Sequence, residues 1–366
     1  MKRNTRTTKN LFVDLTIHTK MRKKQIVFIF AGLVVLQMFT QCAGNLLKPD
    51  LAFNEALPKK YISPDGMTLG EDNCIYLSMN NASNIDFPSK VLRITENDQL
   101  EEVIDLLPHP ETGVASPLGI TFASDGNLYV SDNQSFATNK PNMSRLLKIS
   151  MKNGKAEKCE VVATGLNIAN GITTLGNRIY VAETNLNAGE PHKSGVYRFE
   201  LSELKTENPV QVNGIGDPHL IAILETESTE YKIGANGLAF NSNGELFVCN
   251  FGDAEILKLM LDPDGNVISS EVFAKGKGML SADGMQIDKE DNLWIADFIG
   301  NAIVKISPEG ALRIVAKNGQ SDGHDGSLDA PSECIRRGNR IYVSNIDLSF
   351  GPTVSDSIRT MSIIEL

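Results

Sequence analysis

Oxygen-bearing side chains recur at one position of a repeated pattern, and together they could bind a cation. The six residues at this position stand directly before six short apolar segments: Asp65, Leu118, Asn170, Asn236, Asp283 and, if a short deletion is allowed, Glu333. Asp-Gly and Asn-Gly are common turn dipeptides, so any one of these residues could be an ordinary turn residue. Their shared position separates them from dipeptides such as Asp125-Gly126, which stands before a different recurring segment.

That second segment indicates the elements that must position the six residues. An aromatic residue followed by an aliphatic, a small and a polar residue recurs at 76–79, 129–132, 180–183, 247–250, 294–297 and 342–345. A turn rich in Gly, Asn and Asp precedes most copies, and a short apolar strand precedes each turn, as in β-hairpins. With the alternating segment that follows, each unit predicts four strands in about 50 residues, the pattern of a β-propeller blade.

The predicted fold class is all-β, a six-bladed β-propeller at residues 61–366. The last unit has room for only about three strands before the chain ends, so another segment must complete its sheet. Residues 43–60 are therefore predicted to be a linker and a strand that joins the last blade and closes the ring.

In a propeller the first strands line the central channel and run in the same direction, so the six residues should form a ring at one mouth. Carboxylates crowded there repel one another unless a cation neutralises them. Calcium accepts six to eight oxygen ligands, including Asn carbonyls. The sequence therefore predicts a Ca²⁺ site built from Asp65, Asn170, Asn236 and Asp283, with Mg²⁺, Mn²⁺ or Zn²⁺ left open.

Further residues are candidates for chemistry around this ring. Glu333 is a surplus carboxylate, available as a general base or an extra ligand, or else a solvated loop residue. His109 and His324 lie on loops that lead to first strands and are candidates to overhang the pocket, although an ordinary loop or surface position is the favoured explanation for each. The predicted walls are rich in Asn, Ser, Asp and Pro, which favours a polar, oxygen-bearing ligand.

Four strings of the sequence resemble the gluconolactonase and regucalcin (senescence marker protein, luciferin-regenerating-enzyme-like) family, and more distantly the paraoxonase and diisopropylfluorophosphatase propellers. The strings are 283–288 with 292–297, 236–240 and 170–172, and the resemblance extends over residues 60–345. It implies a divalent metal held by Asp65, Asn236 and Asp283, with Asn170 facing the metal or the substrate. Asp65 departs from the family pattern, which has Glu followed by Gly-Pro, so a closer backbone or a bridging water is expected there.

The resemblance and the ring together predict a divalent-cation-dependent hydrolase of a lactone or related ester, such as a sugar lactone. The cation would polarise the carbonyl, and Asp283 or Glu333 would activate water. Asn170, His324 and His109 are the candidate substrate-binding residues. The alternative is a non-catalytic binding propeller, in which the same ring holds a structural cation and the loops recognise a glycan or protein.

Composition limits the partners. The chain has 366 residues and a net charge of −10, with no basic run beyond its N-terminus. Nucleic-acid surfaces need clustered Lys and Arg, so a nucleic-acid partner is not expected. The protein is expected to be a monomer that binds a small molecule. Cys74, Cys159, Cys249 and Cys334 occur singly, which predicts neither a zinc site nor disulfides.

The N-terminal residues resemble an export signal. Lys and Arg at 22–24 precede an apolar run at 26–39 that is short for a membrane span. Residues 1–42 are therefore predicted to be a signal, with translation starting at Met1 or Met21, and Cys42 either lipidated as in bacterial lipoproteins or not. The expected location is the periplasm or outer membrane of a bacterium, with membrane contact only through the signal or a lipid anchor.

Overall fold

The computed structural model describes residues 45–53, 55–83, 86–187, 189–346, 348 and 359–366. Residues 47–366 form one compact unit. The predicted export signal, including Cys42, lies outside the described residues, so export and lipidation stay predictions. Within the described ranges, no helix has the length and apolar character needed to cross a membrane.

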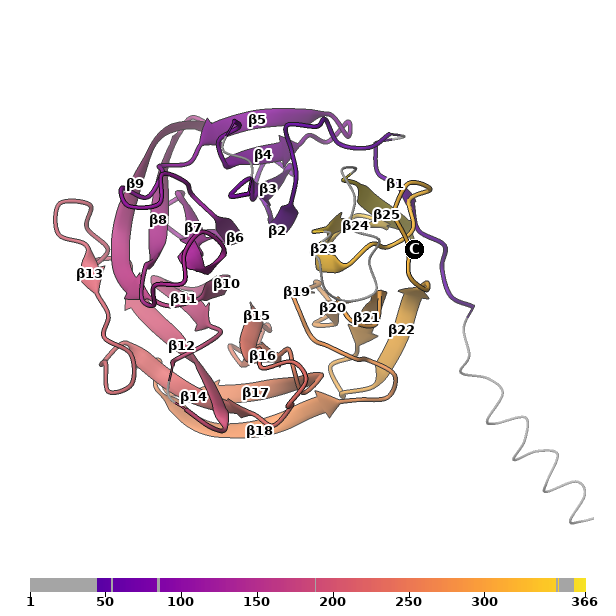
Figure 1. Cartoon of the computed structure of the whole chain (residues 1–366). Coiled ribbons are helices and arrows are strands. Elements are labelled where there is room, and N and C mark those ends of the chain that lie inside the picture. The colour runs from indigo at the N-terminus through magenta and orange to yellow at the C-terminus, as the bar shows by residue number, and fades with distance from the viewer. Residues whose placement is uncertain (1–44, 54, 84–85, 188, 347, 349–358) are drawn as a thin grey trace, which may run out of the picture. The chain divides into compact units, whose positions relative to one another are not determined.

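Residues 47–366 form six sheets arranged around a central channel, and within each sheet the four blade strands are antiparallel (Figure 1). Blade 1 consists of β2 (Pro64–Leu69), β3 (Ile75–Met79), β4 (Lys90–Ile94) and β5 (Leu100–Asp105). Blade 2 consists of β6 (Pro117–Phe122), β7 (Leu128–Asp132), β8 (Ser144–Lys152) and β9 (Lys155–Leu166). Blade 3 consists of β10 (Ala169–Leu175), β11 (Arg178–Glu183), β12 (His192–Glu200) and β14 (Leu220–Thr226).

The second half of the ring repeats this order. Blade 4 consists of β15 (Ala235–Phe240), β16 (Leu246–Asn250), β17 (Glu255–Leu261) and β18 (Val267–Lys275). Blade 5 consists of β19 (Met285–Ile287), β20 (Leu293–Asp297), β21 (Ala302–Ile306) and β22 (Leu312–Lys317). Blade 6 consists of β23 (Pro331–Arg337), β24 (Arg340–Asn345), β25 (Met361–Glu365) and β1 (Asp50–Leu51). The prediction of an all-β, six-bladed propeller is confirmed.

Blade 6 contains strands from both ends of the described chain, which closes the ring. Asp50 of β1 lies opposite Ile363 of β25, and Leu51 lies opposite Ser362. The backbone N–H of Ala52 donates to the carbonyl of Met361 at 2.9 Å. The N-terminal segment therefore joins the last blade. This was predicted because the last repeat unit of the sequence has room for only about three strands.

Two elements go beyond the predicted four-strand repeat. Strand β13 (Val210–Gln211) lies parallel to β9 and gives blade 2 a fifth strand, although it comes from the blade 3 connection between β12 and β14. That connection also buries Leu204 and Val212 in the core between blades 2 and 3. A short 3₁₀ helix, η1 (Gln134–Phe136), follows β7.

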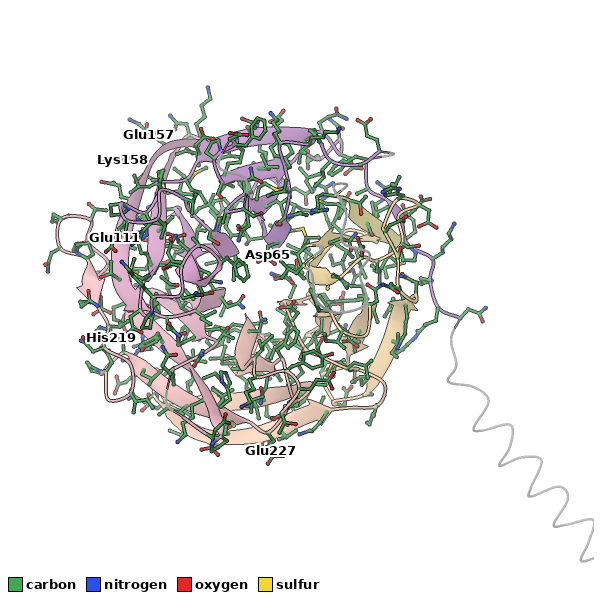
Figure 2. All side chains as sticks on the ribbon, viewed as in Figure 1. Asp65, Glu111, Glu157, Lys158, His219 and Glu227 are labelled. Carbon is green, nitrogen blue, oxygen red and sulfur yellow. The ribbon has the colours of Figure 1, made fainter. Side chains whose placement is uncertain are left out.

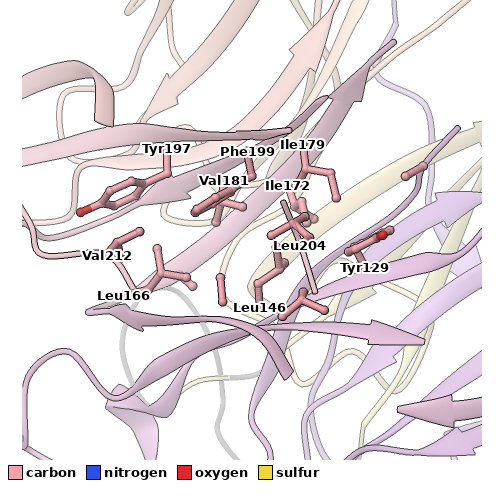
Figure 3. Packing of buried hydrophobic residues seen from close by; sticks show 14 residues of the cluster. Tyr129, Leu146, Leu166, Ile172, Ile179, Val181, Tyr197, Phe199, Leu204 and Val212 are labelled. Carbon is pink, nitrogen blue, oxygen red and sulfur yellow. The ribbon is translucent and has the colours of Figure 1, made fainter. Parts of the chain in front are cut away.

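The hydrophobic core lies mainly between neighbouring blades. Figure 3 shows one such cluster, in which Tyr129 and Leu146 of blade 2 pack with Ile172, Val181 and Phe199 of blade 3. Similar clusters fill the other five blade interfaces. Because each blade buries its apolar faces only against its neighbours, the closed ring is needed to complete the core.

The recurring aromatic residue is a structural element of each blade. The Tyr129 hydroxyl donates to Asp125 Oδ2 at 2.9 Å, and Trp294 Nε1 donates to Asp288 Oδ2 at 2.8 Å. In both cases the acceptor lies in the hairpin turn before the aromatic strand, so the ring is buried while its polar tip holds the turn.

Candidate metal and ligand site at the channel mouth

The structure brings the four predicted metal ligands together. Asp65 lies on β2, Asn170 on β10 and Asn236 on β15, while Asp283 lies two residues before β19. All four line one cavity of about 220 Å³ at the channel. Figure 2 shows Asp65 beside the central channel. Residues distant in sequence thus meet because each lies at the same end of an innermost strand.

A β-bulge directs Asp65, Asn170 and Asn236 toward the channel. In blade 3, Ala169 lies opposite Glu183 and Ile172 lies opposite Val181, so Asn170 and the following glycine share a single partner residue. The innermost strands β2, β6 and β15 have the same register shift. A bulge changes the direction of a side chain relative to the regular alternation, which brings Asn170 to the cavity.

The glycine after the ring residue allows the innermost strands to approach each other closely. A Cβ atom on Gly171 would lie 2.2 Å from the Asn236 carbonyl oxygen, and one on Gly284 would lie 2.4 Å from the Ser332 carbonyl oxygen. Neither glycine has a positive φ, whereas Gly126 in a hairpin turn has φ +76°. These Asp-Gly and Asn-Gly pairs are therefore parts of packed strands, and the turn interpretation is wrong for them.

The sixth ring position belongs to Ser332, and the predicted assignment to Glu333 is wrong by one residue. Pro331 lies opposite Asn345 and Cys334 opposite Val343, the offset seen around Asn170 in blade 3. The Ser332 carbonyl oxygen also lies against Gly284. In the same way, the Asn236 carbonyl oxygen, from a ring residue of blade 4, lies against Gly171 of the neighbouring blade 3. Glu333 consequently occupies the position that is glycine in the other five blades.

Glu333 lines a narrow tunnel next to the ring and does not line the mouth cavity. This tunnel has a volume of about 20 Å³, room for about one water molecule. Glu333 Oε1 accepts the Cys334 backbone N–H at 2.9 Å, and Gln286 Nε2 crosses the tunnel to donate to the Met67 carbonyl at 2.9 Å. A substrate in the mouth cavity therefore meets Asp283 rather than Glu333.

Burial raises the pKa of all three carboxyl groups at the ring and tunnel. Burial raises the pKa of Asp65 to about 6, and burial together with Asp65 raises that of Glu333 to about 8. Burial, then the charges of Asp65 and Glu333, hold the pKa of Asp283 well above its usual range. Among the described residues, none of the groups that shift these three pKa values is a cation. A cation at the ring would remove this penalty.

The donor set fits a hard divalent cation that accepts amide oxygens. Asn236 Nδ2 donates to Asp283 Oδ1 at 2.5 Å, and Asn170 Nδ2 donates to Thr184 Oγ1 at 3.3 Å, so both amides already face the ring or its edge. In the part of the chain that the structure describes, no three His, Cys, Asp or Glu side chains form a group that could hold a metal. A cation held by Asp65 and Asp283 would therefore also need the two Asn oxygens, a donor set that suits calcium better than zinc.

The two histidines predicted to bind substrate do not line the mouth cavity. His109 is buried, its Nδ1 accepts the Glu111 backbone N–H at 3.1 Å, and burial lowers its pKa. His324 lies on a loop with its side chain 44% exposed and Nδ1 3.8 Å from Asp322 Oδ2. Both residues lie on the loops before β6 and β23, as the sequence indicated, but neither is among the residues that form the cavity wall.

Sequence reasoning missed a second ring of cavity residues. The residue that follows the second strand of a blade lines the cavity in blades 2 to 6: Asn133, Thr184, Phe251, Phe298 and Ile346. The signal was present, because each directly follows a copy of the aromatic repeat. The predicted polar pocket is therefore wrong for blades 4 to 6, where apolar side chains stand at the channel mouth.

In blades 2, 3, 5 and 6 the last residue of the second strand holds the loop before the innermost strand. In blade 3, Glu183 accepts the backbone N–H groups of Asn167 and Ile168, both at 2.7 Å, and burial raises its pKa to about 7. In blade 5, Asp297 Oδ1 accepts the N–H of Ser281 at 2.8 Å. These contacts anchor the chain immediately before Asn170 and Asp283.

Comparisons with known proteins agree with this fold. Residues 220–318 match the family model described as SMP-30/Gluconolactonase/LRE-like region. An L-arabinolactonase of Azospirillum brasilense is 27% identical over 129 residues, which are 35% of this chain. The chain spans only 43% of that relative's length.

Solved structures extend the similarity over the whole propeller. A luciferin-regenerating enzyme has a TM-score of 0.56 and 16% identity, covering 87% of this chain and 95% of the other. A gluconolactonase from Xanthomonas campestris has a TM-score of 0.55 and 17% identity, covering 88% and 91%. At these identities the structures demonstrate the shared fold. The chain therefore carries an SMP-30/gluconolactonase/LRE-like region on a six-bladed propeller, as its sequence motifs indicated.

Proposed function

We propose that this protein is a divalent-cation-dependent lactone hydrolase whose active site is the mouth cavity, with calcium as the cation. One observation carries the proposal: oxygen side chains from four blades, Asp65, Asn170, Asn236 and Asp283, meet on the wall of a cavity of small-molecule size. The match to a gluconolactonase-like family model and to a relative named as a lactonase supports the reaction class.

The ring residues have two roles in the proposed reaction: they hold the cation, and one of them activates water. A bound cation supplies a Lewis acid for the ester carbonyl. Asp283 accepts a proton from the water whose oxygen adds to the carbonyl carbon, and a bound cation would keep its carboxylate ionised for this role. The ring C–O bond then breaks, and the alcohol oxygen receives the proton, which leaves a hydroxy acid.

Neighbouring groups orient the base and the substrate. Asn236 Nδ2 donates to Asp283 Oδ1 at 2.5 Å and holds that carboxylate toward the cavity. Asn170 is held at the cavity by Thr184, whose hydroxyl in turn donates to the Ala235 carbonyl at 2.7 Å. Pre-organised polar groups of this kind lower the cost of orienting a reacting ester.

The test is a panel of lactones assayed with chelator and with added Ca²⁺, Mg²⁺ or Mn²⁺. The panel consists of D-gluconolactone, L-arabinonolactone, γ-butyrolactone and dihydrocoumarin, and proton release reports their hydrolysis. We expect turnover of at least one compound that chelator abolishes and a divalent cation restores. If none is hydrolysed with any cation, the hydrolase proposal is wrong and a ligand-binding propeller takes its place.

A further inference from the structure

The mouth cavity has two chemically different sides, set by one position in each blade. The residue after the second strand is polar in blades 2 and 3, where it is Asn133 and Thr184. It is apolar in blades 4, 5 and 6, where it is Phe251, Phe298 and Ile346. A ligand bound over the oxygen ring would therefore touch polar groups on one side and a continuous apolar wall on the other.

The apolar wall is packed and pre-formed. Phe251, Phe298 and Ile346 are only 2%, 1% and 3% exposed and belong to one cluster with Ala330. The rings of Phe251 and Phe298 have their centroids 6.0 Å apart. The Ile346 backbone N–H donates to the Ala330 carbonyl at 3.1 Å, which holds this residue in place. Such a wall offers a binding surface without a large ordering cost.

Blade 2, which carries the polar Asn133, also adds apolar surface to the cavity. Leu118 is the blade 2 member of the ring of residues that contains Asp65 and Asp283. Phe136, the last residue of η1, also lines the cavity. Phe136 is 50% exposed, although the η1 cap holds it there through the Ser135 N–H, which donates to Asn133 Oδ1 at 3.0 Å. Together with the wall of blades 4 to 6, Leu118 and Phe136 make much of the cavity lining apolar, which favours an apolar ligand.

We propose that the preferred substrate is a lactone with an apolar alkyl or aryl substituent, which packs against the wall of blades 4 to 6. This inference rests on the proposed lactone hydrolysis. A sugar lactone carries several hydroxyl groups, and those that faced Phe251, Phe298 and Ile346 would lose hydrogen bonds to water without replacement. No Lys, Arg or His is among the described residues that line the cavity, so hydroxyl groups and carboxylates lack charged partners apart from the ring itself.

The size of the cavity limits the substituent. Its volume of about 220 Å³ is roughly seven times the share of one molecule in liquid water. A small lactone ring with an arm of a few carbons fits this space, with Phe136 available to cover the outer part of the arm. Longer chains would extend past the rim into solvent and gain little more.

The experiment compares kcat/KM for γ-butyrolactone, γ-hexalactone, γ-octalactone and dihydrocoumarin with that for D-gluconolactone and L-arabinonolactone, all with saturating Ca²⁺. We expect kcat/KM to rise about fourfold for each of the first added methylene groups, the value of burying one such group. We also expect the alkyl and aryl lactones to exceed both sugar lactones.

Two variants locate the effect. Phe136→Ser removes the exposed ring without opening the core, and Ile346→Thr places in blade 6 the residue that blade 3 carries at the same position. Each should reduce the ratio of kcat/KM for γ-octalactone over γ-butyrolactone by several fold. The matched control is Ile268→Ser, an exposed apolar residue on the outer strand β18, which should leave every rate unchanged.

The outcomes separate the inference from the function on which it rests. If the sugar lactones are hydrolysed and the alkyl series shows no increase, the apolar-substrate inference is wrong while the hydrolase stands. If the increase occurs but neither cavity variant changes it, the wall has been misassigned and the inference is also overturned. If no lactone in either set is hydrolysed, the proposed function fails, and the inference falls with it.

Discussion

At the scale of single residues, the site depends on which buried carboxylate meets the ligand. Asp283 and Glu333 are both buried and both have raised pKa values. They differ in position, because Asp283 lines the mouth cavity as well as the tunnel, while Glu333 lines only the tunnel. Asp283 occupies the ring position of its blade, whereas Glu333 stands one residue after the ring position of its own blade. This single step along the chain separates the candidate base from a residue that fills the channel.

This difference predicts opposite results for two nearly isosteric substitutions. Asp283→Asn keeps the size of the side chain but removes a charge from the cation site and the proposed base. Cation affinity and kcat/KM should therefore both fall, kcat/KM by on the order of a hundredfold. Glu333→Gln is the matched control and should change kcat/KM by less than about threefold.

Calcium titrations and steady-state kinetics on both variants provide the measurement. A large loss of turnover in Glu333→Gln with unchanged cation affinity would identify Glu333 as the base and contradict the assignment to Asp283. A loss of cation affinity in Glu333→Gln would instead make it a ligand.

At the scale of elements, blades 1, 3 and 4 use a β-bulge followed by a glycine to bring their ring residues together. Gly171→Ala should destabilise the protein by about 1–3 kcal/mol, since its Cβ would lie 2.2 Å from the Asn236 carbonyl oxygen and force β15 outward. Cation affinity should fall as well, because the displaced strand carries Asn236. Urea unfolding and calcium titration measure the two effects.

The control for this variant is Gly319→Ala. A Cβ atom on Gly319 would meet nothing within 4 Å beyond its chain neighbours, and this glycine does not have a positive φ. The substitution should change neither stability nor cation binding by a measurable amount. Equal effects of the two alanines would show that close strand contact is not the reason for glycine at position 171.

Glu183, which anchors the loop before β10, predicts a pH dependence of stability. Its folded-state pKa of about 7 exceeds the ordinary value of 4.5, so the native state holds a proton that the unfolded state has lost between these values. The free energy of unfolding should therefore fall as the pH rises through this window, by about 3 kcal/mol at most, and level off above it.

Urea unfolding at about pH 5 and about pH 8, with chelator present, tests this sign. The Asp65, Asp283 and Glu333 carboxyls contribute in the same direction, so the difference between wild type and Glu183→Gln isolates the Glu183 contribution. The variant should be less stable at low pH, where it lacks a well-matched acceptor, and should show a smaller decrease toward high pH. An identical slope in both proteins would contradict the role of Glu183.

At the scale of the whole molecule, a cation at the ring would connect blades 1, 3, 4 and 5 of the closed propeller. A ligand bound only by the native state stabilises it by about 2.7 kcal/mol at a hundredfold excess over Kd. The melting temperature should therefore rise by several degrees when calcium replaces chelator. Asp283→Asn should show a smaller rise, and an unchanged midpoint in the wild type would mean that the ring does not hold the ion.

The sequence alone determined the architecture and four members of the ring. Strand alternation, turn residues and the aromatic repeat are local patterns, and six copies in phase leave few folds other than a propeller. The same phase placed Asp65, Asn170, Asn236 and Asp283 at one mouth, because each innermost strand runs in the same direction. Ring closure by the N-terminal strand followed from counting strands in the last unit.

Only the tertiary structure decided the sixth ring position and the character of the cavity. In the other five blades a glycine directly follows the ring residue, but blade 6 has no glycine at that position. The register of β23 against β24 was therefore needed to place Ser332 in the ring and Glu333 in the tunnel. Loop composition did not reveal that Phe251 and Phe298 form the wall while His324 stays outside, because composition carries no information about direction. Whether a side chain points into the cavity depends on β-bulges, on the hydrogen bonds that hold the loops and on packing between blades. These features form only when distant segments of the chain meet.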